Sequence, residues 1–120
     1  MKRIVLVLGV LGLTVAGAAK AAGDHASRGE TLYRVYCTQC HGTKGDGRGV
    51  NAATMAVQPR DHTDTAEMSA RTDEELFKVI KHGGKSINKS VLMPAWGANM
   101  TDDDINALVG HLRVLCCRKN

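Results

Sequence analysis

Large aromatic side chains are scarce in this sequence, which has one Trp, two Tyr and one Phe among 120 residues. A small domain with so few large side chains makes a thin core from its own residues. A large, flat, apolar cofactor at its centre would supply the missing buried surface. If the core holds such a cofactor, we expect the protein to be poorly folded without it.

Patterns typical of β-strands are missing as well, and there is no internal repeat. The lack of strands argues against a thioredoxin-like fold, in which a redox-active C-x-x-C pair lies near a β-α-β unit. The stretch 42–49 holds four glycines, but no strand precedes it and it lacks the Gly-Lys-Ser/Thr ending of a phosphate-binding loop. We interpret this stretch as a loop that packs closely against a cofactor edge.

A strong charge imbalance is absent beyond the first residues. The chain carries 16 Lys and Arg against 12 Asp and Glu. Residues 1–21 hold three of the basic residues and no acidic ones, so the remainder has 13 against 12. This balance gives no reason to expect nucleic-acid binding.

The first residues have the pattern of a signal peptide. Lys2 and Arg3 precede an apolar run over 4–19, and Ala19-Lys20-Ala21 fits a small-x-small cleavage site. We expect residues 1–21 to be the signal peptide and 22–120 to be one exported domain. An uncleaved membrane anchor is the alternative, although the run is shorter than the roughly 20 residues of a spanning helix.

Three segments have helical periodicity. The first begins at Ala26 and runs into Cys37; Gly29 within it is easier to explain if another helix crosses there than as a surface glycine. The second helix begins with a capping box, ends at a glycine pair and has His82 in its last turn. The third begins at a Thr cap followed by three carboxylates. The residues behind these assignments are Thr72 with Glu75, Gly83-Gly84, Thr101, and an apolar stripe of Ile105, Leu108, Val109, Leu112 and Leu115.

The most specific motif is Cys37-Thr38-Gln39-Cys40-His41. A C-x-x-C-H sequence is typical of c-type haem attachment. Each thiol forms a thioether with one vinyl group on the same edge of the porphyrin, and the adjacent imidazole reaches the iron from one face. The alternatives are a redox dithiol and a zinc site that recruits Cys116 and Cys117. Adjacent cysteines make awkward ligands at one metal, so we favour haem.

The second face of the iron needs another ligand. Met93 is the strongest candidate, because it lies in a loop between two helices and Pro94 fixes the backbone directly after it. A Met/His pair raises the reduction potential of haem iron. The alternatives left open are other methionines or a second histidine: Met55, Met100, His62, His82 and His111.

These motifs resemble those of the small class I cytochromes c, the monohaem electron carriers of bacterial periplasms. The resemblance extends over almost the whole of 22–120, from Gly29 through the C-x-x-C-H motif and the Gly-rich loop to 93–97 and the last helix. It implies an all-α fold of helices and long loops wrapped around one covalently bound haem, with the first and last helices crossing near Gly29. It also implies thioethers at Cys37 and Cys40 and axial ligands at His41 and Met93.

The sequence departs from the family pattern at three places. Many members have a Pro whose carbonyl orients the axial His, whereas Val50-Asn51 occupies that neighbourhood here. His111 replaces the usual aromatic residue of the last helix. For Cys116 and Cys117 we expect linkage to another chain or oxidation, rather than free thiols or a disulfide between neighbours.

The function that this resemblance implies is one-electron transfer in a periplasmic respiratory chain. We expect a carrier rather than an enzyme, without a small-molecule substrate, that meets redox proteins through a small transient interface. Two alternatives are a dedicated subunit or assembly factor of a larger redox complex, for example in denitrification or sulfur oxidation, and a ligand-binding or peroxidatic haem protein. Side chains that could steer an acidic partner are Lys44, Lys81, Lys85 and Lys89, and Arg60 and His62 could reach a haem propionate.

Overall fold

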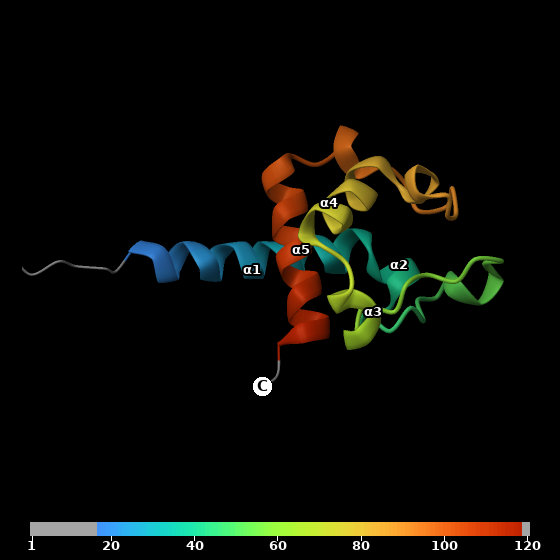
Figure 1. Ribbon diagram of the computed structural model, residues 1–120, viewed down its shortest axis with the longest axis horizontal. Helices are drawn as coiled ribbons and strands as arrows, with labels where there is room; N and C mark the ends of the chain where they lie inside the picture. The colour runs from blue at the N-terminus through green and yellow to red at the C-terminus, as the bar shows by residue number, and fades with distance from the viewer. Residues whose placement is uncertain (1–16, 119–120) are drawn as a thin grey trace, which may run out of the picture.

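The computed structural model describes residues 17–118, and these contain helices and loops but no strand. Figure 1 shows the arrangement: two long helices cross, and short helices and loops fill one side of the crossing. The all-α prediction is confirmed. In chain order the elements are α1 (Gly17–Tyr36), α2 (Thr38–His41), η1 (Ala52–Thr54), α3 (Thr65–Ser69), α4 (Asp73–His82), η2 (Gly84–Ile87), η3 (Trp96–Ala98) and α5 (Asp102–Cys117), where η marks a single 3₁₀ turn.

Most of the predicted signal peptide lies outside the described residues, because it spans 1–21 and the description begins at 17. Helix α1 starts at Gly17, earlier than the predicted Ala26. Within 17–118, no helix combines the length and the apolar character needed to cross a membrane.

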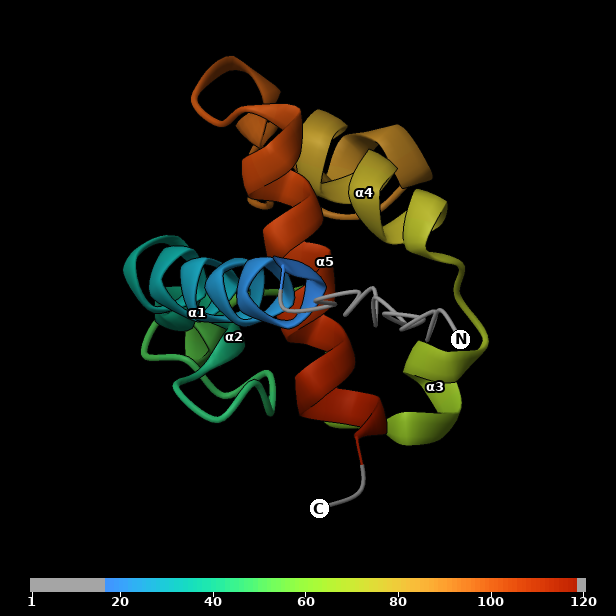
Figure 2. The same ribbon diagram turned by 90° about the vertical axis from the view of Figure 1, so that its left-hand side faces the viewer.

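Helices α1 and α5 cross each other, and both views show the crossing (Figures 1 and 2). A Cβ atom placed on Gly29 would lie only 2.0 Å from the backbone oxygen of Ala107 and 3.0 Å from Cβ of His111. The two backbones therefore touch at a point where only glycine fits. This confirms the predicted crossing and excludes a surface role for Gly29.

Helix α5 is the central element of the core. Its predicted apolar stripe is buried except for Leu115, which is partly exposed. Thr101 caps its first turn, as predicted, and the Thr101 hydroxyl and Arg28 of α1 lower the pKa of Asp104. The buried core cluster comprises Tyr33, Met68, Leu76, Ile80, Met100, Ile105, Leu108, Val109, Leu112 and Cys116.

Helix α4 has the boundaries that the sequence indicates. Thr72 and Glu75 form the predicted capping box, and Leu76 and Ile80 face the core. The helix ends at Gly83, whose φ of 78° lies in the left-handed region that favours glycine. His82 is exposed in the last turn, as expected.

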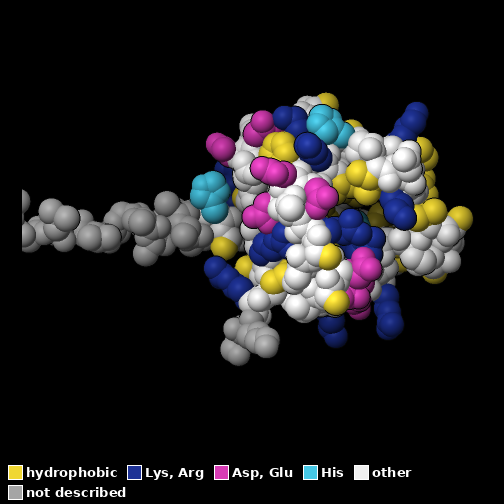
Figure 3. Space-filling view, viewed as in Figure 1, with side chains coloured by type: hydrophobic (Ala, Val, Ile, Leu, Met, Phe, Trp, Pro, Cys, Tyr) yellow, Lys and Arg dark blue, Asp and Glu magenta, His cyan; other side chains and the backbone are white. Residues whose placement is uncertain are grey.

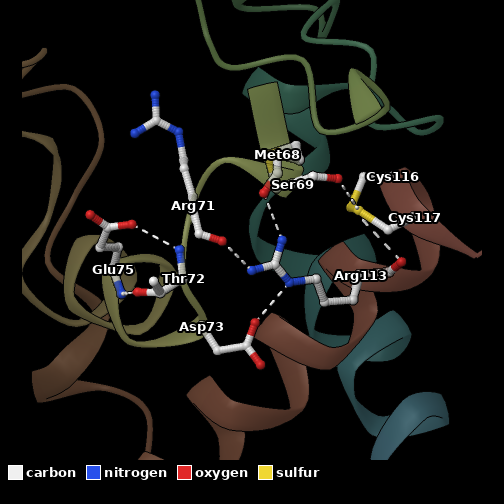
Figure 4. Close-up of polar contacts among 9 residues, drawn as sticks. All are labelled: Met68, Ser69, Arg71, Thr72, Asp73, Glu75, Arg113, Cys116 and Cys117. Atoms are coloured by element: carbon white, nitrogen blue, oxygen red, sulfur yellow. Dashed lines mark hydrogen bonds and ion pairs between the residues drawn. A yellow bond between two sulfur atoms is a disulfide. The ribbon is translucent and has the colours of Figure 1, made fainter. Parts of the chain in front are cut away.

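The segment before α4 contains a short helix that the sequence analysis missed. Asp64 caps α3 by accepting a hydrogen bond from the backbone of Glu67, and Met68 is completely buried. Arg113 of α5 anchors this segment (Figure 4): it donates to the carbonyls of Met68 and Arg71 and pairs with Asp73. The anchor fixes the segment against the lower half of α5.

Cys116 and Cys117 are joined to each other by a disulfide (Figure 4). The expectation of linkage to another chain is therefore wrong in this structure, because both sulfurs are used within the chain. The pair occupies the last turn of α5, where carbonyl groups lack helical partners and the backbone is less constrained than inside the helix. Thr65 satisfies one of these carbonyls by donating to Cys116 O at 2.6 Å.

The crossing generates a stability prediction. Gly29→Ala forces α1 and α5 apart and should lower the free energy of unfolding by about 1–3 kcal/mol, the usual cost of overpacking. The matched control is Gly110→Ala on α5, where an added Cβ meets nothing within 4 Å. This control should gain roughly 0.5–1 kcal/mol from helix propensity. Urea unfolding of the two variants gives the comparison, and equal stabilities would contradict the close crossing.

A second prediction concerns pH. His111 lies half-buried against Tyr33, with ring centroids 5.0 Å apart. Burial lowers its pKa from the usual 6.5, and the charge of Glu30 partly opposes this shift. The unfolded state therefore binds more protons between the lowered pKa and 6.5, so this contribution to stability falls as the pH falls through that window.

The variants His111→Phe and His111→Gln should both lose this part of the pH dependence, whatever their absolute stability. The measurement is the free energy of unfolding at pH 7.5 and at pH 5 for each protein. Because Phe keeps an aromatic ring and Gln does not, a change shared by both variants reports titration rather than packing. An unchanged difference between the two pH values in both variants would refute the assignment.

Candidate functional site

A cavity of about 560 Å³ lies between the end of α1, helix α4 and the loops on either side. Its volume is within the roughly 300–1,000 Å³ of typical ligand sites. Apolar side chains are exposed on the side of the molecule where these loops lie, toward the right in Figure 3. The exposed apolar residues of the loops are Val50, Val57, Ile87, Val91 and Leu92.

The three residues of the C-x-x-C-H motif reach this cavity together. Cys37 follows the last turn of α1, and His41 donates its backbone N–H to Cys37 O at 2.9 Å, which closes the single turn of α2. Both thiols are free and half-buried. Burial, and then the neighbouring Cys40, raise the pKa of the Cys37 thiol to about 12. A redox-active dithiol depends on a thiol with a lowered pKa, and Cys37 shows the opposite shift.

His41 is held by a backbone carbonyl. Its Nδ1 lies 3.0 Å from Arg60 O. A carbonyl only accepts hydrogen bonds, so Nδ1 carries the proton and Nε2 keeps its lone pair for a metal. Burial lowers the pKa of His41 in spite of this hydrogen bond, which favours the neutral, ligating form. The sequence left open which backbone carbonyl orients His41, and the structure shows that Arg60, directly after Pro59, supplies it.

His62 has a place that sequence reasoning missed. Its ring is buried and stacks on the His41 ring, with centroids 4.2 Å apart and planes 19° from parallel. Nδ1 of His62 is hydrogen-bonded to the Tyr33 hydroxyl at 2.9 Å. Burial, followed by the nearby His41, lowers the pKa of His62 to about 3, so its ring is neutral.

The expected contact of Arg60 and His62 with a haem propionate stays a prediction, and both residues line the cavity. The His62 side chain packs beneath His41, and the Arg60 guanidinium pairs with Glu67. One signal was available in the sequence: Tyr33, Cys37 and His41 are spaced four residues apart. On a helix this spacing puts side chains on one face, so Tyr33 could have been assigned to the site.

Met93 lies in the loop between η2 and η3, lines the same cavity and is half-buried. Its carbonyl accepts the N–H of Gly84 at 3.0 Å. An added Cβ on Gly84 would lie 2.3 Å from Ser90 O and 3.0 Å from the Met93 side chain, and one on Gly83 would lie 2.8 Å from Met93 O. The glycine pair therefore does more than end α4, because it provides the surface on which the Met93 loop rests.

The alternative ligands differ in their positions. Met55 and Met68 line the cavity, whereas Met100 is buried in the core cluster and does not. Neither His82 nor His111 lines the cavity, and His62 lies beside His41. Of the residues predicted from sequence, the structure thus brings Cys37, Cys40, His41 and Met93 to one cavity. Ligation by Met93 stays a prediction.

The residues of the zinc alternative do not assemble. Cys116 and Cys117 form their disulfide at the end of α5, and neither lines the cavity that holds Cys37 and Cys40. In the described part of the chain, no three His, Cys, Asp or Glu side chains are grouped so that they could hold a metal ion.

Comparison with known families gives a match over residues 24–112 to the model described as Cytochrome C oxidase, cbb3-type, subunit III. The chain belongs to this family of c-type cytochrome domains. No curated protein matches the chain.

Two solved structures are similar to this cytochrome domain. One is a chain of the Kuenenia stuttgartiensis reducing HAO-like protein complex Kustc0457/Kustc0458, with 26% identity and a TM-score of 0.60. The match covers 74% of this chain but only 41% of that one. The other is the KustC0563 c-type cytochrome, with 24% identity, a TM-score of 0.60 and coverage of 73% and 96%. The second likeness supports the predicted cytochrome c fold.

The residues at the cavity fit the covalently bound haem c that this family carries. Two free, half-buried thiols and a neutral imidazole with a free Nε2 lie on one wall. A thioether, the soft ligand of cytochromes c, lies on another. The cofactor also accounts for the scarcity of aromatic residues, since it fills the space between the helices that side chains leave open. The protein is a small monohaem c-type cytochrome.

The contact between the Gly83-Gly84 pair and the Met93 loop can be tested directly. In the holoprotein, Gly84→Ala should displace the loop and weaken the far-red absorption band of methionine–iron ligation, while the thioethers and His41 stay in place. Gly110→Ala is the control, because an added Cβ there meets nothing within 4 Å. A full-strength band in Gly84→Ala would show that the loop does not depend on this contact.

Proposed function

We propose that the protein is a one-electron carrier of a periplasmic respiratory chain, and that it is not an enzyme. The observation that supports this most strongly is the placement of His41 and Met93 at one cavity, which leaves no open iron position for a substrate if both ligate. Haem c supplies a ferric–ferrous couple when it is bound. The chain's own residues hold the iron-ligating groups, exclude water and leave one side of the cavity near exposed apolar loops.

The partner would be a redox protein that docks briefly at this exposed side, as weak redox encounters do. Of the four lysines considered for steering, Lys81 already pairs with Asp102 at 2.7 Å and lies over the Phe77 ring. That leaves Lys44, Lys85 and Lys89, which are exposed. Lys89 also lines the cavity, so it is the best placed to meet an acidic partner.

A second candidate is a dedicated subunit of a larger redox assembly. Two observations favour it. The description of the family names a subunit of an oxidase. One of the similar structures is a chain of a protein complex, and the match covers only 41% of that longer chain. The fold and ligands would not differ between the two roles. Purification of the native protein under mild conditions distinguishes the two roles. A partner that co-purifies in a fixed ratio supports the subunit role, whereas the lack of any such partner at every salt concentration supports the free carrier.

Periplasmic location is part of the proposal, and it rests on the signal-like residues 1–21 together with covalent haem attachment. Cleavage after Ala21 is expected, and a retained membrane anchor is the alternative. The mass of the purified holoprotein distinguishes a chain that begins at Ala22 from one that keeps residues 1–21.

The carrier proposal predicts a defined set of spectra. The oxidised protein should show the far-red methionine–iron band, and the reduced protein should not bind carbon monoxide. Met93→Ala should abolish the band and open the iron to carbon monoxide, whereas Met55→Leu, at the same cavity, and Met100→Leu, in the core, should keep the wild-type spectra. A wild type that lacks the band and binds carbon monoxide at once would favour a ligand-binding or peroxidatic role.

A further inference from the structure

Four rings contact one another in succession from the haem cavity to the crossing of α1 and α5. His41 stacks on His62, His62 is hydrogen-bonded to Tyr33, and Tyr33 contacts His111. Tyr33 and His62 are both buried. Nothing in the electron carrier described above uses His62, although the cost of burying an imidazole is substantial.

The backbone around His62 is built to hold the ring in place. Its N–H donates to Gly45 O at 2.6 Å, so the Gly-rich loop is tied to it. Gly45 has φ of 79°, and an added Cβ there would lie 3.4 Å from the Tyr33 hydroxyl and 3.5 Å from Cβ of His62. On the other side, Asp61 accepts hydrogen bonds from the backbone and the hydroxyl of Thr63. The ring is therefore fixed by its own loop, by the Gly-rich loop and by α1.

The stacking constrains a motion that the Arg60 carbonyl does not. A hydrogen bond at Nδ1 fixes the position of one ring atom, but it leaves the His41 plane able to tilt about that atom. A flat neutral ring at 4.2 Å and 19° covers one face of His41 and restricts the tilt. The plane of an axial imidazole sets how its orbitals overlap with those of the iron, and groups beyond the direct ligands tune metal sites in this way.

We propose that His62 is a positioning residue for the axial ligand: held by the Tyr33 hydroxyl, it fixes the plane of the His41 ring and thereby sets the ferric ligand field and the reduction potential. This inference rests on the proposed ligation of iron by His41. Arg60 and His62 then act together, one on the direction of the ring and the other on its tilt.

The test uses four variants of the holoprotein, studied by electron paramagnetic resonance of the ferric form and by potentiometric titration. His62→Leu removes the flat ring and should spread the low-spin g-values over several orientations and shift the potential. His62→Phe keeps a flat ring and should restore a single signal close to wild type. Tyr33→Phe removes only the hydroxyl and should shift the potential in the same direction as His62→Leu, by less. Ile105→Val, a conservative change in the buried core, should behave as wild type.

Wild-type g-values and potential in both His62→Leu and Tyr33→Phe would overturn the proposal. A Phe variant as disturbed as the Leu variant would overturn it too, since stacking would then not be the property that matters. If His62→Leu fails to incorporate haem, the comparison of Tyr33→Phe with wild type still decides. Failure of the carrier proposal is seen separately, because the wild type itself would then lack the low-spin His/Met spectrum.

Discussion

The contact between the backbones of α1 and α5 at Gly29 is the constraint on which the site depends. The crossing fixes α1 against the helix that supplies most of the core, and α1 carries Tyr33 toward its end and leads directly into Cys37 and His41. A shift of α1 along α5 would therefore move the thiols and the imidazole together. The C-x-x-C-H motif is local in sequence, but its position in the molecule is set by the Gly29 contact on the preceding helix α1, which runs directly into Cys37.

The two walls of the cavity are held by different kinds of interaction. On the histidine wall, buried rings and a backbone carbonyl from a distant loop fix one side chain from several directions. On the methionine wall, two 3₁₀ turns and a glycine pair support a loop whose Val91 and Leu92 are exposed. The first wall resembles a packed interior, whereas the second has fewer buried contacts and is held mainly through its backbone.

The features that the sequence predicted are those encoded within a few residues. The capping box at Thr72, the N-cap at Thr101 and the apolar stripe of α5 are confirmed, because each depends on one turn or one helix face. The features that it could not predict join residues that are far apart. Arg60 supplies the carbonyl to His41 from 19 positions away, and Tyr33 bonds His62 from 29 positions away. Neither pairing leaves a periodic or spacing signal, since loops bring them together.

If His41 and Met93 both ligate the iron, the unequal support of their side chains bears on which of the two can be displaced. Displacing His41 would require the loss of a stacked, buried ring contact and a hydrogen bond in a region of low dielectric, where unpaired polar groups are costly. Displacing Met93 requires only that a partly exposed loop moves away from Gly83 and Gly84. Any conversion of this cytochrome into a ligand-binding protein, by mutation or by partner docking, is therefore expected to begin on the methionine side. The exposed apolar residues Ile87, Val91 and Leu92 lie on that same side. If Met93 is the ligand, docking of a redox partner there would bear directly on whether it stays bound.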